Sequence, residues 1–153
     1  MRRQDREKDA LFAFEVLRDS EYVTLATVNL DGTPYCIPIS AVLVGNALYF
    51  HCATEGQKLT NINKSSTVCI SGVRHTKIIP ENFTTEYESA VATGICKAVL
   101  DEEEKIMAMR ALCEKYAMDN MGNFDAAMAK SFHRVTVCRV DIEQITGKTN
   151  LDF

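Results

Sequence analysis

The sequence contains no tryptophan, no long apolar run and no closely spaced pair of cysteines. Its first fifteen residues, MRRQDREKDALFAFE, are charged and never reach the continuous apolar stretch that a secretory signal or a membrane span needs. We therefore expect a soluble cytoplasmic protein without a membrane partner.

Concentrated positive charge is also scarce. The net charge is −4, and the basic residues are spread along the chain apart from a short cluster of Arg2, Arg3 and Arg6. A nucleic-acid interface needs a basic stripe, often with aromatic residues between the charges. The sequence therefore predicts no nucleic-acid partner.

The six cysteines stand singly inside apolar stretches, at positions 36, 52, 69, 96, 113 and 138. A disulfide framework or a structural zinc site needs closer groups, so this spacing favours buried, reduced thiols. No trio of His, Asp, Glu or Cys has the spacing of metal ligands, and the GxGxxG and GxxxxGK[ST] motifs do not occur. We predict no metal site and no Rossmann-type dinucleotide site.

What the chain does contain is a series of short alternating apolar segments. Its 153 residues, 46% of them hydrophobic, suit one domain spanning residues 1–153. The pattern predicts strands at Tyr22–Val28, Pro34–Val44, Ala47–Ala53, Thr67–Val73, Thr85–Leu100 and Arg134–Ile145. It predicts helices at Glu7–Arg18, at Gly56–Lys64, from Asp101 with an apolar stripe of Ile106, Met109, Cys113 and Tyr116, and at Phe124–Ser131.

The predicted strands carry local irregularities. Gly94 predicts a bend, a change of apolar phase near Arg139 predicts a β-bulge, and the Pro80-containing stretch from His75 to Thr84 is expected to be a loop. Strands in this number with alternating faces usually close into a small barrel, because closure removes exposed edges. We therefore expect a mainly β fold with peripheral helices, built on a six-stranded antiparallel barrel.

The turn between the third strand and the following helix is a candidate anion site. The strand ends at His51, Cys52 and Ala53, and a helix opens at Gln57 and Lys58 after Gly56. Such a turn exposes backbone N–H groups at the positive end of a helix, and Lys58 adds a full charge. The alternative is that Gly56 only permits the turn and that Lys58 is a solvated surface residue.

Other candidate residues each have a structural and a functional interpretation. Pro38 cannot donate to a sheet ladder, so it marks a strand edge or an irregularity. His51 is either a strand-end structural group or an anion-binding and proton-exchanging residue. Tyr87 and Ser89 alternate on one face of the fifth strand, as rim residues or ligand contacts. His75 and His133 are expected at the surface or at strand ends.

In combination, several segments resemble one family over nearly the whole chain. They are the N-terminal Arg2, Arg3 and Arg6, LATVNLDGTPYCIPIS (Leu25–Ser40), YFHCATEGQK (Tyr49–Lys58), YESAVATG (Tyr87–Gly94) and ITGK (Ile145–Lys148). Their order and spacing are similar to those of the FMN-binding split-barrel superfamily that includes pyridoxamine 5′-phosphate oxidase. Within it, the chain resembles the nitroimidazole-resistance-like branch.

This resemblance implies a split β-barrel that binds FMN, with FAD or haem less favoured, at the interface of a homodimer. It places Lys58 near the phosphate, the strand containing Pro38, Ile39 and Ser40 along the flavin ring, and His51 near the flavin as the candidate catalytic residue. The full set of cofactor-binding residues that it implies is Pro38, Ile39, Ser40, His51, Cys52, Ala53, Gly56, Gln57, Lys58, Asn61, Tyr87 and Ser89.

The resemblance suggests an FMN-dependent oxidoreductase that reduces a small molecule, such as a nitroaromatic compound of the 5-nitroimidazole type. Two alternatives remain open: a flavin- or haem-binding carrier without turnover, with His51, His75 or His133 as an axial haem ligand, and an interaction dimer without cofactor. Pyridoxamine 5′-phosphate oxidase activity itself is not expected, because the chain is short, lacks tryptophan and has no recognisable arginine-rich substrate elements.

Overall fold

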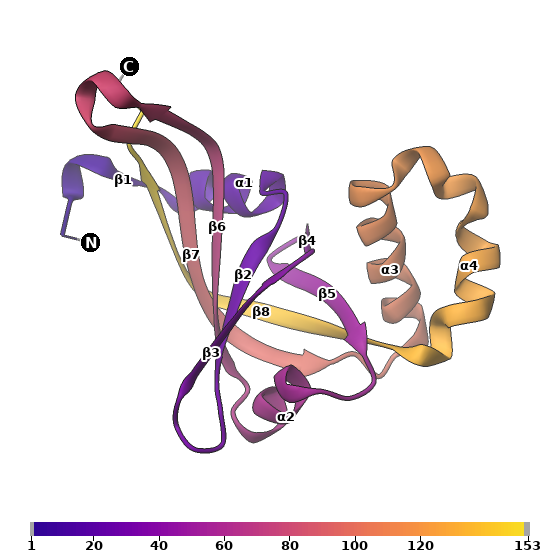
Figure 1. Cartoon of the computed structure of the whole chain (residues 1–153). Helices are drawn as coiled ribbons and strands as arrows, with labels where there is room; N and C mark the ends of the chain where they lie inside the picture. Colours follow the sequence, from indigo (N-terminus) through magenta and orange to yellow (C-terminus); the bar gives the residue numbers. More distant parts are fainter. Residues whose placement is uncertain (1, 152–153) are drawn as a thin grey trace.

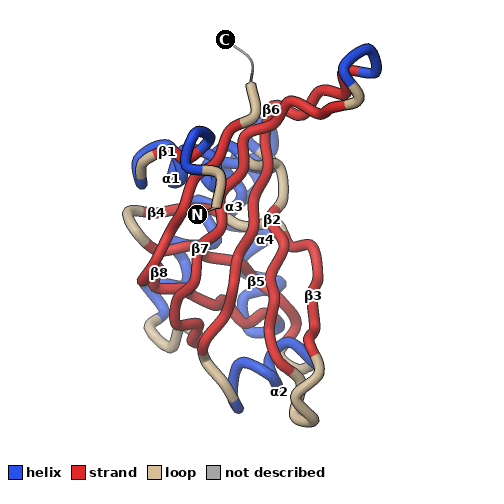
Figure 2. The backbone as a smooth tube through the Cα atoms, turned by 90° about the vertical axis from the view of Figure 1, so that its left-hand side faces the viewer, coloured by secondary structure: helices blue, strands red, loops and turns tan. Residues whose placement is uncertain are grey.

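The computed structural model describes residues 2–151, which form one antiparallel sheet curled into a split barrel (Figures 1 and 2). The strands are β1 (Glu7–Lys8), β2 (Val23–Val28), β3 (Pro34–Ile39), β4 (Val42–Val44), β5 (Ala47–Ala53), β6 (Thr67–Ile79), β7 (Thr84–Ala98) and β8 (Val135–Thr149). Their order is β3-β2-β6-β7-β8-β5-β4, and β1 pairs with β8. The predicted mainly β barrel is confirmed, with eight strands in place of six.

Helices lie at the periphery of this sheet. They are α1 (Ala10–Asp19), α2 (Gln57–Lys64), α3 (Glu102–Tyr116) and α4 (Phe124–Ser131), with 3₁₀ turns η1 (Gln4–Arg6), η2 (Pro80–Asn82), η3 (Met118–Asn123) and η4 (Phe132–Arg134). Figure 1 shows α3 and α4 together on one side of the barrel and α2 at its lower end. No helix among residues 2–151 has both the length and the apolar character to cross a membrane.

Aspartate side chains determine where two helices begin. The Asp9 carboxylate accepts a hydrogen bond from the N–H of Phe12 at 2.9 Å, and that of Asp101 accepts one from the N–H of Glu104 at 2.8 Å. The predicted start of the first helix at Glu7 is therefore wrong, because the Asp9 cap starts α1 at Ala10. Residues Glu7 and Lys8 pair with β8 instead.

Two apolar clusters hold the elements together. The barrel interior is filled by side chains such as Leu25, Phe50, Ile70 and Val140, each at most 1% exposed. The second cluster joins α3 and α4 to the outer face of β5 and β8, and its buried members are Ala47, Tyr49, Ala108, Met109, Leu112, Phe124 and Val137. The predicted α3 stripe was correct at Met109 but wrong at Ile106 and Tyr116, which are 43% and 39% exposed.

The predicted strand Pro34–Val44 is two strands on opposite edges of the sheet. β3 pairs with β2, whereas β4 pairs with β5. The chain crosses from one edge to the other at Ser40 and Ala41. The backbone groups of Ala41 hydrogen-bond to the Tyr116 hydroxyl instead of a strand, so the ladder ends there.

The predicted bulge near Arg139 is wrong in position. Arg139 stays in register with both neighbouring strands, and the register shifts where Thr93 and Gly94 of β7 face Gln144 and Ile142 of β8. The bend expected at Gly94 coincides with this shift. A Cβ atom at Gly94 would lie 2.1 Å from the backbone oxygen of Asp141, so only glycine lets the two strands approach so closely.

The stretch expected to be a loop, His75–Thr84, is mostly strand. β6 and β7 continue past the barrel as a hairpin closed by η2, and we call residues 74–88 the arm. Beyond its base at Arg74 and Glu88, most side chains of the arm face solvent on both sides, so its sequence lacks the alternation that marks a half-buried strand. Figure 2 shows the arm projecting beyond the rest of the sheet.

Candidate functional site

A helix N-terminus without a capping side chain follows β5 directly. Gly56 is the N-cap of α2 with a φ of +135°, and no side chain among residues 2–151 caps the N–H groups of the first turn. A Cβ atom at Gly56 would meet nothing within 4 Å, and the first turn of α2 contains no acidic residue. The backbone N–H groups and the positive end of the helix dipole are therefore available to an anion. We call residues 53–58 the cradle.

Lys58 adds a full positive charge to the cradle. Its ammonium nitrogen lies 5.7 Å from the centroid of the Phe50 ring, within cation–π range. The same charge acts on His51, where it contributes to a lowered pKa. Lys58 is only partly exposed, because its side chain packs beside Phe50 of β5.

His51 lies on the opposite face of β5 from the buried Phe50 and is exposed. Desolvation, followed by the charge of Lys58, lowers the pKa of His51 below its ordinary value of 6.5. The imidazole is therefore neutral at pH 7, with one nitrogen that donates and one that accepts a hydrogen bond. Its predicted catalytic role remains a prediction.

The next two residues of β5 have different surroundings. Cys52 faces the barrel interior, where a hydrogen bond with the Cys138 thiol, together with burial, raises its pKa. A protonated thiol of this kind packs as a small apolar group and is a poor nucleophile. Ala53 is exposed at the end of the strand, opposite Val135, and opens the cradle.

Two predicted cofactor-binding residues hold α2 in place. The Asn61 side chain is fully buried, and its amide nitrogen donates to Thr27 Oγ1 at 3.0 Å and Asn29 Oδ1 at 2.9 Å. The Gln57 amide nitrogen donates to Asn61 Oδ1 at 2.8 Å and Asn29 Oδ1 at 3.2 Å. These contacts attach α2 to the β2–β3 hairpin, so they hold the cradle at the start of α2 in position.

Pro38, Ile39 and Ser40 lie at the end of an edge strand, as expected from the proline. β2 is the strand neighbour of β3, and the exposed Pro38 has Thr24 as its partner. Ile39 packs against the barrel core. Ser40 follows the last ladder pair, so its backbone groups lie outside the β2–β3 ladder.

Two residues that the sequence did not single out for this strand end hold it in position. The Tyr116 hydroxyl bonds both backbone groups of Ala41, accepting from its N–H at 3.0 Å and donating to its carbonyl at 2.9 Å. The Lys115 ammonium donates to the carbonyls of Ser20 and Ala41, each at 2.9 Å, and burial lowers its pKa. A tyrosine preceded by lysine near a helix end carries no motif, so only the structure reveals this role.

Tyr87 and Ser89 lie at the other end of the sheet from the cradle, next to the arm (Figures 1 and 2). His51 pairs with Val137, and Glu88 pairs with Thr149, twelve residues farther along β8. At about 3.3 Å per residue this is a path of about 40 Å, much longer than one flavin. A single chain therefore does not bring all the predicted cofactor-binding residues together.

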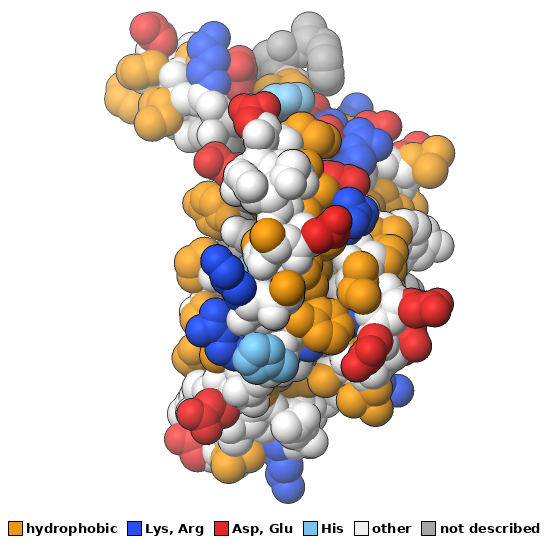
Figure 3. Space-filling view, turned by 90° about the vertical axis from the view of Figure 1, so that its right-hand side faces the viewer, with side chains coloured by type: hydrophobic (Ala, Val, Ile, Leu, Met, Phe, Trp, Pro, Cys, Tyr) orange, Lys and Arg blue, Asp and Glu red, His pale blue; other side chains and the backbone are white. Residues whose placement is uncertain are grey.

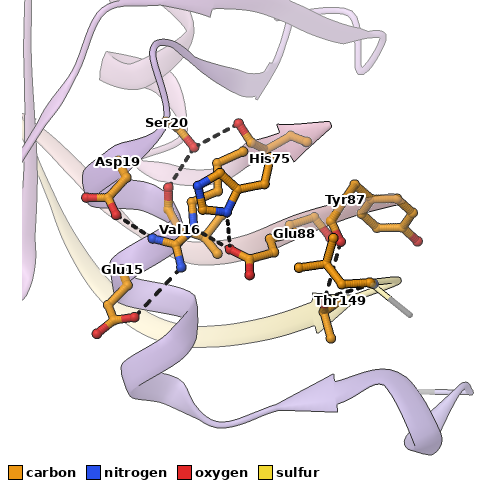
Figure 4. A network of polar contacts seen from close by, with 12 residues as sticks. Glu15, Val16, Asp19, Ser20, His75, Tyr87, Glu88 and Thr149 are labelled. Carbon is orange, nitrogen blue, oxygen red and sulfur yellow. Dashed lines mark hydrogen bonds and ion pairs between the residues drawn. The ribbon is translucent and has the colours of Figure 1, made fainter. Parts of the chain in front are cut away.

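A polar network surrounds the base of the arm (Figure 4). Arg74 forms ion pairs with Glu88 of β7 and Asp19 of α1, and its guanidinium also lies 3.8 Å from Glu15. His75, which the sequence placed at the surface, is exposed and has its Nδ1 3.1 Å from Glu88 Oε2. Its φ of 53° lies at the register shift between Arg74 and Lys77, where the arm leaves the barrel.

The outer side of β3, β2, β6 and β7 carries few charges over the barrel, and the exposed Lys97 lies near the end of β7. Figure 2 shows these four strands side by side, on the side away from α3 and α4, whereas Figure 3 shows charges of both signs on the helix side. We call this surface the open sheet face. Its outward residues are Thr24, Ala26, Val28, Pro34, Cys36, Pro38, Cys69, Ser71, Val73, Ser89, Val91 and Thr93. The three valines are between 43% and 46% exposed, so the face resembles an uncovered interface.

Comparison with known proteins adds a family match and structural neighbours. The family model described as pyridoxamine 5′-phosphate oxidase matches residues 9–149. No curated protein sequence matches the chain.

Three solved structures illustrate the structural likeness. A candidate 5-nitroimidazole antibiotic resistance protein from Bacteroides thetaiotaomicron is 25% identical with a TM-score of 0.78, and the match covers 93% of this chain and 84% of that one. The flavocytochrome Anf3 from Azotobacter vinelandii is 15% identical with a TM-score of 0.84, covering 99% and 72%. The FAD and haem binding protein from Mycobacterium smegmatis is 17% identical with a TM-score of 0.83, covering 97% and 75%.

Proposed function

Because the chain belongs to the pyridoxamine 5′-phosphate oxidase family, we propose that it is an FMN-dependent oxidoreductase that works as a homodimer. The observation that carries this proposal is the uncapped N-terminus of α2 with Lys58 in its first turn. FMN ends in a phosphate monoester, which matches one helix N-terminus and one ammonium group. The flavocytochrome and the FAD and haem binding protein among the structural neighbours support a flavin over other anions.

The residues around the cradle fit the rest of the cofactor. Gly56 leaves room for a phosphate against the backbone, and the strand end at Pro38–Ser40 supplies backbone groups outside the ladder for the polar edge of the ring. His51, neutral at pH 7, lines the same end of the barrel. When bound, FMN supplies the hydride or electron transfer, while the protein supplies position, hydrogen bonds and exclusion of water.

The homodimer rests on two observations. The open sheet face carries few charges and is partly apolar, as the centre of a protein interface is. The predicted cofactor-binding residues fall into two groups at opposite ends of the sheet, with Lys58 in one group and Tyr87 in the other. A two-fold dimer in which the open sheet faces of two copies pack in antiparallel orientation brings the first group of one copy toward the second group of its partner, so the dimer holds two equivalent sites.

The substrate we propose is a small nitroaromatic compound of the 5-nitroimidazole type. Its support is the neighbour assigned to 5-nitroimidazole resistance, which combines the highest identity of the three structures with coverage of 93% of this chain. A flavin needs few protein groups for such a reduction, so the side chains at the site do not identify the substrate. A carrier that holds the flavin without turnover is the alternative within the same site.

Absorption spectroscopy of the purified protein, with mass identification of the released chromophore, is the first test. FMN titration then compares Lys58→Glu with Lys64→Glu, a change of the same charge in the last turn of the same helix. We expect Lys58→Glu to raise the Kd for FMN at least about tenfold, because it places a negative charge at the phosphate, and Lys64→Glu to leave it unchanged. Equal affinities for the two variants would refute the cradle.

Haem is a second candidate ligand, and the His75–Glu88 contact favours it. A histidine that ligates a metal often has its other ring nitrogen bonded to a carboxylate, as His75 Nδ1 is to Glu88. A Soret band that His75→Ala abolishes would support this function. Haem binding that persists in His75→Ala would show that another residue is the axial ligand.

A further inference from the structure

The arm ends in apolar side chains that the single chain leaves in solvent. Phe83 is 99% exposed and Ile78 is 74% exposed, and orange side chains gather at the arm in Figure 3. Phe83 also adopts a left-handed backbone with a φ of 48°, which is unfavourable for a bulky residue. Burying such side chains stabilises a protein, so their exposure here indicates a surface that is covered by contact.

The base of the arm is held rigidly. Arg74 connects the two strands of the arm to α1 through Glu88 and Asp19, and its side chain is 13% exposed. The carbonyl of Tyr87 accepts a hydrogen bond from the N–H of Asn150 at 2.9 Å. The direction of the arm is therefore set by the folded barrel.

The arm bends toward the side on which the open sheet face lies. Figure 1 shows it turning out of the sheet to the left, and Figure 2 views the molecule from that side, where β3, β2, β6 and β7 are uncovered. A second copy seated on the open sheet face would therefore lie within reach of the arm. A hollow of about 610 Å³ lies beside the arm and is lined by Ile78, Phe83 and Tyr87 among others.

We propose that the arm of each copy closes over the cofactor site of its partner, with Phe83 and Ile78 forming an apolar wall beside the flavin ring. This inference rests on the proposed function, because the two-fold dimer carries the arm of one copy toward the cradle of the other. The wall excludes water from the reduced flavin and restricts the acceptor to small, flat, weakly polar molecules. Each site is then incomplete without the partner subunit.

The absence of tryptophan makes a direct test available. Phe83→Trp introduces a lone indole at the arm tip, and Lys58→Glu disables the cradle of a chosen chain. Glutamate in the first turn suits the helix dipole, so α2 is expected to keep its fold. Two heterodimers are purified with different affinity tags. In the first heterodimer, one chain carries both Phe83→Trp and Lys58→Glu, and its partner is wild type. In the second heterodimer, one chain carries Phe83→Trp and its partner carries Lys58→Glu.

Each heterodimer keeps one working cradle, so FMN fills one site in both. In the first, the arm that carries the indole reaches that filled site, and we expect FMN to reduce tryptophan emission at least about twofold, because a flavin against an indole quenches it. In the second, the arm faces the disabled cradle, and emission should change much less. Quenching confined to the second heterodimer, or weak quenching in both despite bound FMN, overturns the inference while leaving the proposed function intact. A wild-type chain that binds no FMN overturns both.

Discussion

Arg74 and Glu88 form an ion pair across β6 and β7 at the base of the arm, with side chains 13% and 9% exposed. The same guanidinium reaches Asp19 of α1, so one arginine joins the arm, the barrel and the first helix (Figure 4). Because little water reaches the pair, Glu88 depends on Arg74 for the compensation of its charge.

Removing Arg74 should therefore destabilise the protein strongly. We expect Arg74→Ala to lower the free energy of unfolding by about 3 kcal/mol, because the nearly buried Glu88 loses its arginine partner and keeps only the contact with His75. Arg18→Ala is the control: its pair with Asp19 is 59% and 40% exposed, and its loss should change stability by less than about 1 kcal/mol. Urea titration measures both values, and similar losses for the two variants would contradict this account.

Gly94 should tolerate no side chain. A Cβ atom there would lie 2.1 Å from the Asp141 carbonyl oxygen, which is backbone and cannot move aside cheaply. We expect Gly94→Ala to lower the free energy of unfolding by at least about 3 kcal/mol or to prevent folding. Gly122→Ala, where nothing lies within 4 Å, should fold normally, and thermal unfolding of both variants checks the contrast.

The Tyr116 hydroxyl should act on the flavin through Ala41. Tyr116→Phe removes a donor and acceptor to both backbone groups of Ala41, so we expect a loss of about 1–2 kcal/mol in stability. Because the crossing between β3 and β4 at Ser40–Ala41 is then less fixed, the Kd for FMN should rise a few-fold and the visible flavin spectrum should shift. Tyr22→Phe, at an exposed tyrosine, is the control. An unchanged spectrum and Kd in Tyr116→Phe would leave Tyr116 a purely structural role.

His51 should make the apoprotein less stable in mild acid. Its pKa is lowered in the folded state, mainly by desolvation, so the unfolded chain binds a proton more readily once the pH falls below about 6.5. The folded state consequently loses stability as the pH falls from about 6.5 to the lowered pKa, and nothing is lost above that window. His51→Gln should flatten the dependence of the melting temperature on pH between about pH 7 and 5, relative to His133→Gln. Parallel curves for the two variants would show that the His51 environment does not disfavour its charge.

Much of the fold could be predicted from local patterns. The strands β2 and β5, the proline on an edge strand and the α2 helix after Gly56 are all found in the structure. These features depend on neighbours in sequence, which is why turn chemistry and apolar period reveal them. The arm was missed for the same reason: with both of its faces in solvent, its strands have no apolar period to read.

The sequence by itself determined the barrel class, the position of the cradle and the family of this protein. The tertiary structure alone decided that β3 and β4 lie on opposite edges of the sheet. It also decided that Asn61 and Tyr116 hold the site in position, and that Lys58 and Tyr87 lie at opposite ends of the sheet. These are relationships between residues far apart in the sequence. They depend on how strands pair and curl, and no local pattern of side chains encodes that.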